Sequence, residues 1–318
     1  MEERKIRLGI VGCGHIFKKH LQAIVDNANL FEIVGVANHN KEIVLEFPKE
    51  WKVQTFYDHK EMFSKLGEKL DLVVILTQST YHYDITKETL ESGYDVLIEK
   101  PVAIDISKIK EINDLATKLG RKAHSVLQCR YMSVFSSLKS ILKENLIGDI
   151  RCIDFAQMWQ RPIGHINKMK PPPLYEYSIH YLDIIQILFG IPKVFFTKTF
   201  THKHIGAPYE DTIRSVVEYN GGISGSIRVT LAFEPSSWGT KLLIMGSKGY
   251  LDVDFVNSKV DASFEDKEDK EKYDKLMSTV VEDNCFGQLY KEIYGKNAIT
   301  VLDSIQVVQF IQNIYGKI

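Results

Sequence analysis

Short apolar runs alternate with helix-like patterns through the first third of the chain. Strands are predicted at residues 6–11, 31–37, 70–77, 95–99 and 122–128, with helices at 16–26, through Ile85 and Leu90 to Gly93, and at 106–119. The strand runs are continuously apolar rather than alternating, which is typical of strands buried on both faces. Strands that alternate with helices indicate right-handed βαβ units. We therefore predict a doubly wound parallel sheet of the Rossmann type in residues 1–122.

The pattern changes after residues 122–128. Helices are predicted at 134–146, from the prolines at 171–173 to 189, and at 301–315, with a strand at 150–158. Between 194 and 256, strand-like runs are broken by glycine and proline, which is typical of antiparallel hairpins. We predict a second α/β domain with a mostly antiparallel open sheet in residues 123–318, whose last helix packs back on the first domain. The mixed charges at 266–275 predict a solvated loop or an exposed helix face.

Composition is that of a soluble globular protein. The chain has 318 residues, about twice the usual domain length. Its formal net charge of -1 gives no general attraction to nucleic acid, and no apolar stretch approaches the roughly 20 residues that span a bilayer. The charged start runs directly into an apolar strand, so we expect no signal peptide and a cytoplasmic protein without membrane or nucleic-acid partners. The four cysteines are far apart, so neither a metal site nor a disulfide framework is expected.

A glycine-containing turn follows the first predicted strand, with the sequence Gly12-Cys13-Gly14-His15-Ile16-Phe17. Glycines at this place let the backbone approach a pyrophosphate, which the N-terminus of the next helix stabilises. A plain tight turn would contain the same two glycines, but the position between a strand and a helix favours dinucleotide binding. Candidate cofactor-binding residues are Gly12, Gly14, His15 and Ile16. Phe17 replaces the third glycine of the fingerprint and is expected to alter the packing of helix against sheet.

The end of the second predicted strand carries Asn38 and His39, followed by Lys41. NAD-dependent enzymes usually have Asp or Glu there, which hydrogen-bonds the ribose hydroxyls. Without that carboxylate, nothing repels a 2′-phosphate, and His39 or Lys41 offers a positive partner for one. Asn38 can still hydrogen-bond a ribose hydroxyl, and a plain polar strand end would read the same way. The cofactor is therefore predicted to be NAD or NADP, with a slight lean to NADP.

Several motifs in order resemble the Gfo/Idh/MocA oxidoreductase family, typified by glucose–fructose oxidoreductase and inositol dehydrogenase. They are Thr77-Gln78-Ser79-x-x-His82, Gly93-Tyr94-Asp95-Val96, Glu99-Lys100-Pro101, Gln128-Cys129-Arg130-Tyr131, Gly148-Asp149-Ile150, Glu176-x-x-x-His180-x-x-Asp183 and Gly246-Ser247-Lys248-Gly249. The chain departs from the family at Phe17, at Gln78 (usually Pro), at Glu176 (usually Asp), at Ser178 (usually Gly) and at Pro171-Pro172-Pro173 (usually glycines). The resemblance covers nearly the whole chain, and the departures bear on the substrate more than on the chemistry.

The resemblance implies three catalytic residues. Oxidation of a secondary alcohol needs a hydride acceptor, a base and a group that stabilises the developing alkoxide. Histidine suits the base role, which falls to His180, and Glu176 would orient its ring from one helical turn away. Lys100, at the carboxyl end of a parallel strand, would bind the substrate oxygen. Two alternatives involve no catalysis. Glu176 and His180 could form a surface pair worth about 0.2–0.5 kcal/mol, and Lys100 could merely end a strand.

Other candidate residues are assigned with alternatives left open. Thr77, Glu99, Lys100 and Gln128 are candidate cofactor contacts, although Gln128 suits a structural crossover nearly as well. His82 is predicted either to cap the helix after Thr77 or to contact the cofactor. Candidate substrate residues are Lys100, Arg161, His165 and His180. The cationic segment with Arg161, His165, Lys168 and Lys170 hints at an anionic substrate, and an exposed polar loop would look the same.

The resulting hypothesis is an NAD(P)-dependent oxidoreductase that acts on a secondary hydroxyl or ketone of a sugar, cyclitol or sugar nucleotide. Two alternatives from the same family stay open: a non-catalytic cofactor-binding sensor or regulator, and an NAD-dependent glycosidase. Retention of Lys100 and His180 argues against the sensor. The resemblance also implies a homodimer or homotetramer formed through the second sheet.

Overall fold

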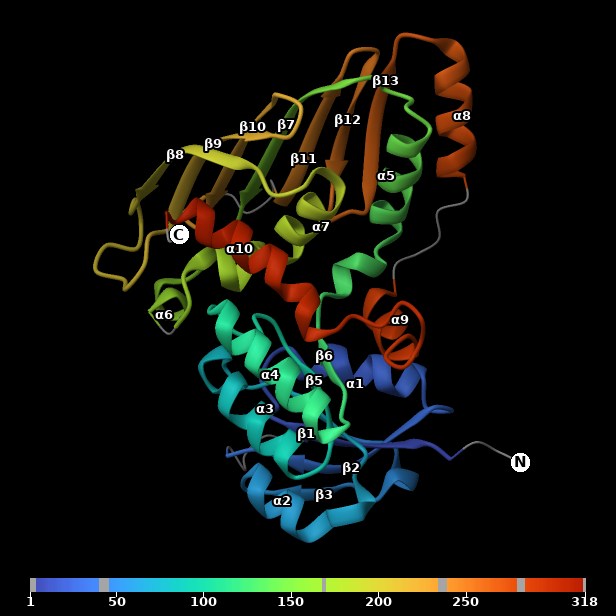
Figure 1. Cartoon of the computed structure of the whole chain (residues 1–318), viewed down its shortest axis with the longest axis vertical. Coiled ribbons are helices and arrows are strands. Elements are labelled where there is room, and N and C mark those ends of the chain that lie inside the picture. Colours follow the sequence, from blue (N-terminus) through green and yellow to red (C-terminus); the bar gives the residue numbers. More distant parts are fainter. Residues whose placement is uncertain (1–3, 40–45, 168–169, 234–238, 279–283, 317–318) are drawn as a thin grey trace. The chain divides into compact units, whose positions relative to one another are not determined.

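The computed structural model describes residues 4–39, 46–167, 170–233, 239–278 and 284–316. The chain forms two compact units (Figure 1). The first comprises Met1–Gln128 and Cys285–Ile305, and the second comprises Cys129–Asn284 and Gln306–Ile318. The predicted boundary after residue 122 stays a prediction. The units are discontinuous in sequence, because Cys285–Ile305 joins the first unit while most of the last helix is grouped with the second.

The first unit is built on a six-stranded parallel sheet in the order β3-β2-β1-β4-β5-β6. Its strands are β1 (Ile6–Val11), β2 (Phe31–Ala37), β3 (Gln54–Phe56), β4 (Leu72–Ile75), β5 (Asp95–Ile98) and β6 (Ala123–Ser125). Its helices are α1 (Phe17–Asp26), α2 (His59–Leu66), α3 (His82–Glu91), α4 (Ile106–Leu119) and α9 (Cys285–Lys291), with short turns η1 (Lys49–Trp51), η2 (Gly67–Lys69), η3 (Ser79–Tyr81) and η6 (Val301–Asp303). The strand order reverses between β1 and β4, which is where ligands bind in sheets of this kind.

Burial explains why the central strands of this sheet form as predicted. All four residues of β4 are buried, and so are the last four residues of β1, which leaves no polar face on these strands. The helices between them carry the expected stop signals: α4 begins after Asp105, whose side chain accepts a hydrogen bond from the Ser107 N–H, and ends at Gly120 in the left-handed conformation. The predicted Rossmann-type parallel sheet is confirmed.

The second unit is built on a seven-stranded sheet in the order β13-β12-β11-β7-β10-β9-β8. Its strands are β7 (Ile150–Met158), β8 (Lys193–Phe200), β9 (Thr212–Tyr219), β10 (Ile223–Thr230), β11 (Gly239–Gly246), β12 (Gly249–Asp254) and β13 (Lys259–Phe264). Its helical segments are η4 (Gln128–Tyr131), α5 (Ser133–Lys143), α6 (Ile163–Ile166), η5 (Leu174–Ser178), α7 (Ile179–Phe189), α8 (Lys267–Met277) and α10 (Ser304–Ile314). Only the β7–β10 pair among these described strands is parallel, so the predicted, mostly antiparallel sheet is confirmed.

One face of the second sheet packs against helices and the other is open. Tyr181 of α7 contacts Phe155 of β7 and Phe255, and Phe189 at the end of α7 contacts Tyr219 of β9. Burial therefore alternates along the strands, and on β9 Arg214, Val216 and Glu218 are exposed between buried neighbours. The charge run at 266–275 is resolved in favour of the helix: α8 forms there, with ion pairs four residues apart on its exposed face.

Candidate active site

The glycine turn after β1 has a backbone that tolerates no side chain at its first glycine. Gly12 has a φ of +93°, and a Cβ there would lie 3.0 Å from the backbone carbonyl of Leu76, which follows β4. The Gly12 N–H donates to the Ala37 oxygen at the end of β2. Gly14 is different, because nothing lies within 4 Å of a Cβ at that position. The turn is therefore pressed against the sheet at Gly12 and open at Gly14, as a loop that receives a pyrophosphate requires.

The start of α1 is suited to an anion. Its first turn contains no acidic residue, and no side chain caps the N-terminus at Ile16. Phe17 is 3% exposed and packs edge-to-face against Phe47, so its ring points away from the turn. Burial raises the pKa of the Cys13 thiol to about 12, so at neutral pH its side chain is a neutral thiol and places no negative charge at the turn. His15 is exposed beside the turn. These residues fit a dinucleotide.

Asn38 reaches from the end of β2 to the glycine turn. Its Oδ1 accepts a hydrogen bond from the Cys13 N–H at 3.3 Å. The amide group can still donate to a ribose hydroxyl, which a carboxylate cannot do. The His39 ring lies edge-on to Tyr57, with 4.7 Å between the ring centroids. Lys41, the other predicted cation here, lies outside the described residues.

Glu99 and Lys100 follow β5, and a buried hydrogen-bond network holds them. The Glu99 carboxylate is 3.0 Å from His20 Nε2 through Oε1 and accepts the Lys100 N–H at 2.9 Å through Oε2. His20 Nδ1 is 2.8 Å from the hydroxyl of Tyr290 on α9. Sequence reasoning missed His20 and Tyr290. A histidine on the buried side of α1 was the only local signal, and nothing local marks Tyr290, which is 270 positions away.

His82, the first residue of α3, ties together the ends of two strands. Its side chain is buried, with Nδ1 2.8 Å from the Pro101 oxygen and Nε2 3.0 Å from the Thr77 oxygen. Burial lowers the pKa of this imidazole. Both ring nitrogens face backbone carbonyls, so the geometry favours a positioning role. Thr77 is half-buried after β4, and Gln128 is buried in η4.

The two predicted catalytic residues of the second unit lie where a π-helical turn becomes an α-helix. Glu176 belongs to the π-helical η5 and His180 to α7, and both are half-buried. Gln157 of β7 anchors the turn: its amide donates to the Tyr177 oxygen at 3.2 Å, and its Oε1 accepts from the Ser178 hydroxyl at 2.5 Å. π-helical turns of this kind occur often at functional sites.

Asp183 holds the same helix to the chain entering the unit. The Arg130 guanidinium donates to both oxygens of Asp183, at 2.7 and 2.8 Å, and the Asp183 side chain is 1% exposed. This two-pronged pairing fixes both groups more strongly than a single contact would. Arg161 follows β7 in the same unit. His165 lies on α6, and its side chain is outside the described residues, as is the whole of Lys168.

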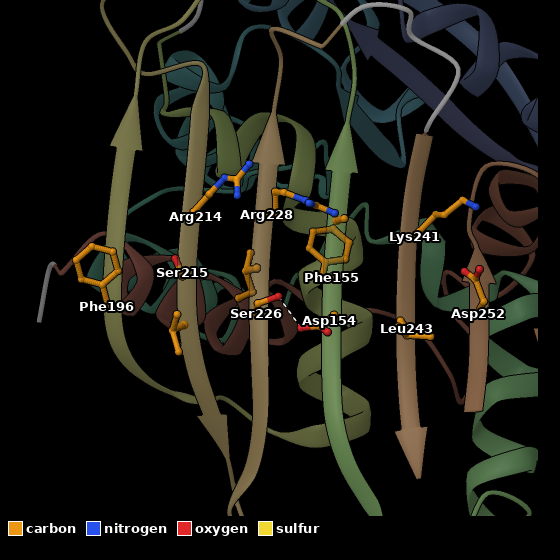
Figure 2. A pocket seen from close by; sticks show the side chains of 13 residues that line it. Asp154, Phe155, Phe196, Arg214, Ser215, Ser226, Arg228, Lys241, Leu243 and Asp252 are labelled. Carbon is orange, nitrogen blue, oxygen red and sulfur yellow. Dashed lines mark hydrogen bonds between the residues drawn. The ribbon is translucent and has the colours of Figure 1, made fainter. Parts of the chain in front are cut away.

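A separate cavity of about 660 Å³ lies on the open face of the second sheet (Figure 2). Its lining includes Arg214, Arg228 and Lys241, with Asp154 and Asp252 on neighbouring positions. These residues alternate with residues buried under α7, so the cavity is on the opposite face from the helix that carries His180. The sequence did not predict this cavity, because alternating apolar and polar residues indicate which face of a sheet is exposed but not whether that face is concave.

Among the residues that the structure describes, no group of three or more His, Cys, Asp or Glu side chains is placed to hold a metal ion. No helix in the described part of the chain is both long and apolar enough to cross a membrane.

Comparison with known proteins identifies the family. The model of an oxidoreductase family with an NAD-binding Rossmann fold matches residues 6–126, and that of the GFO/IDH/MocA C-terminal domain matches residues 135–252. The chain belongs to the GFO/IDH/MocA oxidoreductase family. The resemblance read from the motifs is thus confirmed.

Individual relatives are distant. The chain is 24% identical over 229 residues to the uncharacterized oxidoreductase YdgJ of Escherichia coli, an alignment that covers 67% of this chain and 62% of that protein. It is 26% identical to the D-glucoside 3-dehydrogenase of Escherichia coli, with 70% of each covered. The crystal structure of the WlbA dehydrogenase of Bordetella pertussis in complex with NADH and UDP-GlcNAcA superposes with a TM-score of 0.83 at 22% identity, covering 100% of this chain and 96% of that one.

Proposed function

We propose that this member of the family is an NAD(P)-dependent dehydrogenase or reductase that transfers a hydride between the nicotinamide and a secondary hydroxyl or ketone of a sugar, cyclitol or sugar nucleotide. The observation that carries the proposal is the turn at Gly12, which excludes a side chain next to an α1 N-terminus free of acidic residues. Relatives that act on a D-glucoside or hold UDP-GlcNAcA support the substrate range.

Gly12, Gly14, His15 and Ile16 would bind the pyrophosphate, and Asn38 and His39 the adenosine ribose. The other proposed cofactor residues are Thr77, His82, Glu99, Lys100 and Gln128, with His82 acting through the backbone it holds. The bound nicotinamide supplies the hydride acceptor or donor. Family membership supports NAD, and the lack of a carboxylate at Asn38 keeps the lean to NADP.

In the oxidation direction, His180 accepts the hydroxyl proton as the substrate carbon loses its hydride. Glu176 stabilises the resulting imidazolium, and the Lys100 ammonium hydrogen-bonds the substrate oxygen while alkoxide character develops. Arg161 and His165 are the proposed substrate-binding residues. The network of Glu99 and His20 supports this assignment, because it fixes the backbone of Lys100.

The first test is a fluorescence titration of cofactor-free protein with NADH and NADPH. We expect micromolar binding of at least one, and the preferred form reports what Asn38 and His39 recognise. Turnover is then assayed with a panel of sugars and cyclitols. Lys100→Met and His180→Asn are each expected to lower kcat by roughly 1,000-fold, and His180→Asn should leave cofactor affinity within about threefold.

Other outcomes would redirect the proposal. Cofactor binding without turnover of any compound would favour a sensor. Cofactor that stays bound while a glycoside is hydrolysed, without net reduction, would favour a glycosidase. Absence of binding below millimolar concentrations would remove the oxidoreductase proposal altogether.

We also propose a cytoplasmic homodimer or homotetramer. None of the four cysteines is in a disulfide, which suits a reducing compartment. On the open sheet face, Lys198, Arg214, Arg228 and Lys241 fall on one row across β8, β9, β10 and β11. Asp154, Asp252 and Asp261 fall on the next row. A two-fold contact between copies can set one copy's cations against the other's carboxylates.

The exposed apolar groups of the same face provide the test. Phe196 is 57% exposed and Val216 is 52% exposed, side by side on β8 and β9. Phe196→Asp is expected to shift the protein to monomer in light scattering, whereas Tyr81→Asp, on an exposed tyrosine of the first unit, leaves its mass unchanged. A wild-type monomer at all concentrations would contradict the assembly.

A further inference from the structure

The backbone of Arg161 is held on both sides. Its N–H donates to the Leu231 oxygen at 3.0 Å, and its carbonyl oxygen is 2.7 Å from Nε2 of His204, which donates to it. Leu231 in turn donates to the Asp211 oxygen. A segment that leaves a strand is usually mobile, but here both backbone polar groups of Arg161 have a partner.

A buried, hydrogen-bonded pair of a histidine and an aspartate stands behind that contact. His204 Nδ1 lies 3.2 Å from Asp211 Oδ2, and both side chains are fully buried. The Asp211 carboxylate also accepts the N–H groups of His202, Lys203 and His204 at 2.8–3.0 Å. These hydrogen bonds hold its pKa at about 2, although burial alone would raise it. Burying a carboxylate and an imidazole costs free energy unless both groups are fully paired. Here they are paired with each other and with backbone groups, and this pairing fixes the loop against Arg161.

The side chain of Arg161 is held by two aromatic rings. The guanidinium carbon lies 4.4 Å from the Trp159 ring centroid and 5.0 Å from that of Tyr177. A cation–π contact of this kind does not use up the five N–H donors of a guanidinium. One of these reaches the Gln160 oxygen at 3.2 Å.

No counter-charge neutralises this guanidinium in the described part of the chain, where Arg161 makes no ion pair. Tyr177 does not provide one, because burial raises the pKa of its phenol to about 12, against the opposing effect of Arg161, and it is neutral at pH 7. Arg161 is therefore a fixed, half-exposed positive charge with a planar set of donors.

The position of this charge connects it to the candidate active site. Tyr177, on which Arg161 stacks, follows Glu176 directly in η5, and α7 with His180 begins two residues later. Gln157 of β7 anchors that turn, and Arg161 is four positions further along the same chain segment. Arg161 therefore contacts the turn that carries Glu176.

We infer that Arg161 is the specificity-determining residue for an anionic sugar, whose carboxylate or phosphoryl group it binds in a bidentate manner while the hydroxyl to be oxidised lies at Glu176 and His180. This inference rests on the proposed sugar oxidoreductase activity and narrows it to charged substrates. His204 and Asp211 act through Arg161 as positioning residues. A neutral sugar of the same shape would leave the guanidinium without a partner and would bind more weakly.

The experiment compares D-glucuronate, D-glucose 6-phosphate and D-glucose, which share a ring and differ in charged group. Affinity is measured by calorimetry with cofactor-loaded protein, and turnover is followed by nicotinamide absorbance. The variants are Arg161→Gln, which removes the charge and keeps a polar side chain, and Arg161→Lys, which keeps the charge and loses the planar fork. Arg151→Gln, at the exposed start of β7, is the matched control.

We expect the wild type to bind at least one anionic sugar roughly 30-fold or more tightly than glucose. Arg161→Gln should abolish that difference, Arg161→Lys should retain part of it, and Arg151→Gln should leave it unchanged. If Arg161→Gln weakens the binding of glucuronate alone, the substrate carries a carboxylate. If it weakens the binding of glucose 6-phosphate alone, the substrate carries a phosphate.

The two proposals fail separately. Anion binding that is absent from the wild type, or equal in wild type and Arg161→Gln, overturns this inference even when glucose is oxidised. Anion binding that depends on Arg161, without turnover of any sugar, supports the inference and removes the proposed reaction.

Discussion

The two sheets of this protein hold their functional groups in different ways. In the first unit, β1 and β4 are buried throughout their paired lengths, and the decisive feature at their ends is backbone conformation, with Gly12 pressed on Leu76. In the second unit, the strands are buried on one face only, and the decisive features are side-chain networks such as His204–Asp211 behind Arg161. Under the proposed function, the first arrangement would bind a ligand's phosphates with backbone groups that any such protein can offer. The second one is built from particular side chains, and these can set substrate specificity.

The largest effect is expected at Gly12, where the backbone conformation determines the shape of the turn. Gly12→Val adds a branched side chain at positive φ against the backbone of Leu76, so we expect unfolding to become easier by at least about 3 kcal/mol and NADH affinity to fall roughly 100-fold or more. Gly14→Ala, where a Cβ meets nothing, should change stability by less than about 0.5 kcal/mol. Urea unfolding and fluorescence titration measure both. Equal unfolding free energies for Gly12→Val and Gly14→Ala would contradict the difference between the two glycine positions.

The next effect tests the side-chain network of the second unit. Asp211→Asn should lower the free energy of unfolding by about 2 kcal/mol at pH 7, because the folded-state pKa of about 2 lies below the ordinary value of 3.8. A depressed carboxyl pKa stabilises the fold above the ordinary value, and this stabilisation is lost as the pH falls from about 4 to about 2. The difference between variant and wild type should shrink over that range.

The control for this measurement is Asp114→Asn, on an exposed position of α4. Its unfolding free energy should follow the wild type at every pH. A difference between Asp211→Asn and wild type that stays constant between pH 5 and pH 2 would contradict the assignment of the low pKa to Asp211.

The smallest effect asks whether the first unit also depends on side chains. Tyr290→Phe removes the hydroxyl that meets His20 Nδ1 and leaves the ring packed, so we expect a loss of about 1 kcal/mol in unfolding free energy. Tyr81→Phe, at a tyrosine that is 56% exposed, should be neutral. A loss for Tyr290→Phe as large as that for Asp211→Asn would show that the two units depend on buried networks to a similar degree.

Periodicity predicted much of the secondary structure. The strands at 6–11, 31–37 and 150–158 and the helix at 106–119 form with the predicted bounds. These segments are long and carry uninterrupted patterns. The short β3 and the helices α2 and α9 were not predicted, because their few apolar residues form no clear period. The π-helical turn at Glu176 was read as ordinary helix, since the change of pitch depends on its anchoring by Gln157.

The sequence by itself determined the family, the parallel and antiparallel sheets and the identity of Gly12, Lys100 and His180 as candidates, because local spacing and short motifs carry that information. Only the tertiary structure decided what holds these groups: Tyr290 and His20 behind Glu99, and His204 behind Arg161. His204 lies 43 positions from Arg161 and Tyr290 lies 270 positions from His20. Hydrogen bonds over such separations depend on the path of the folded chain, and no local pattern of residues encodes them.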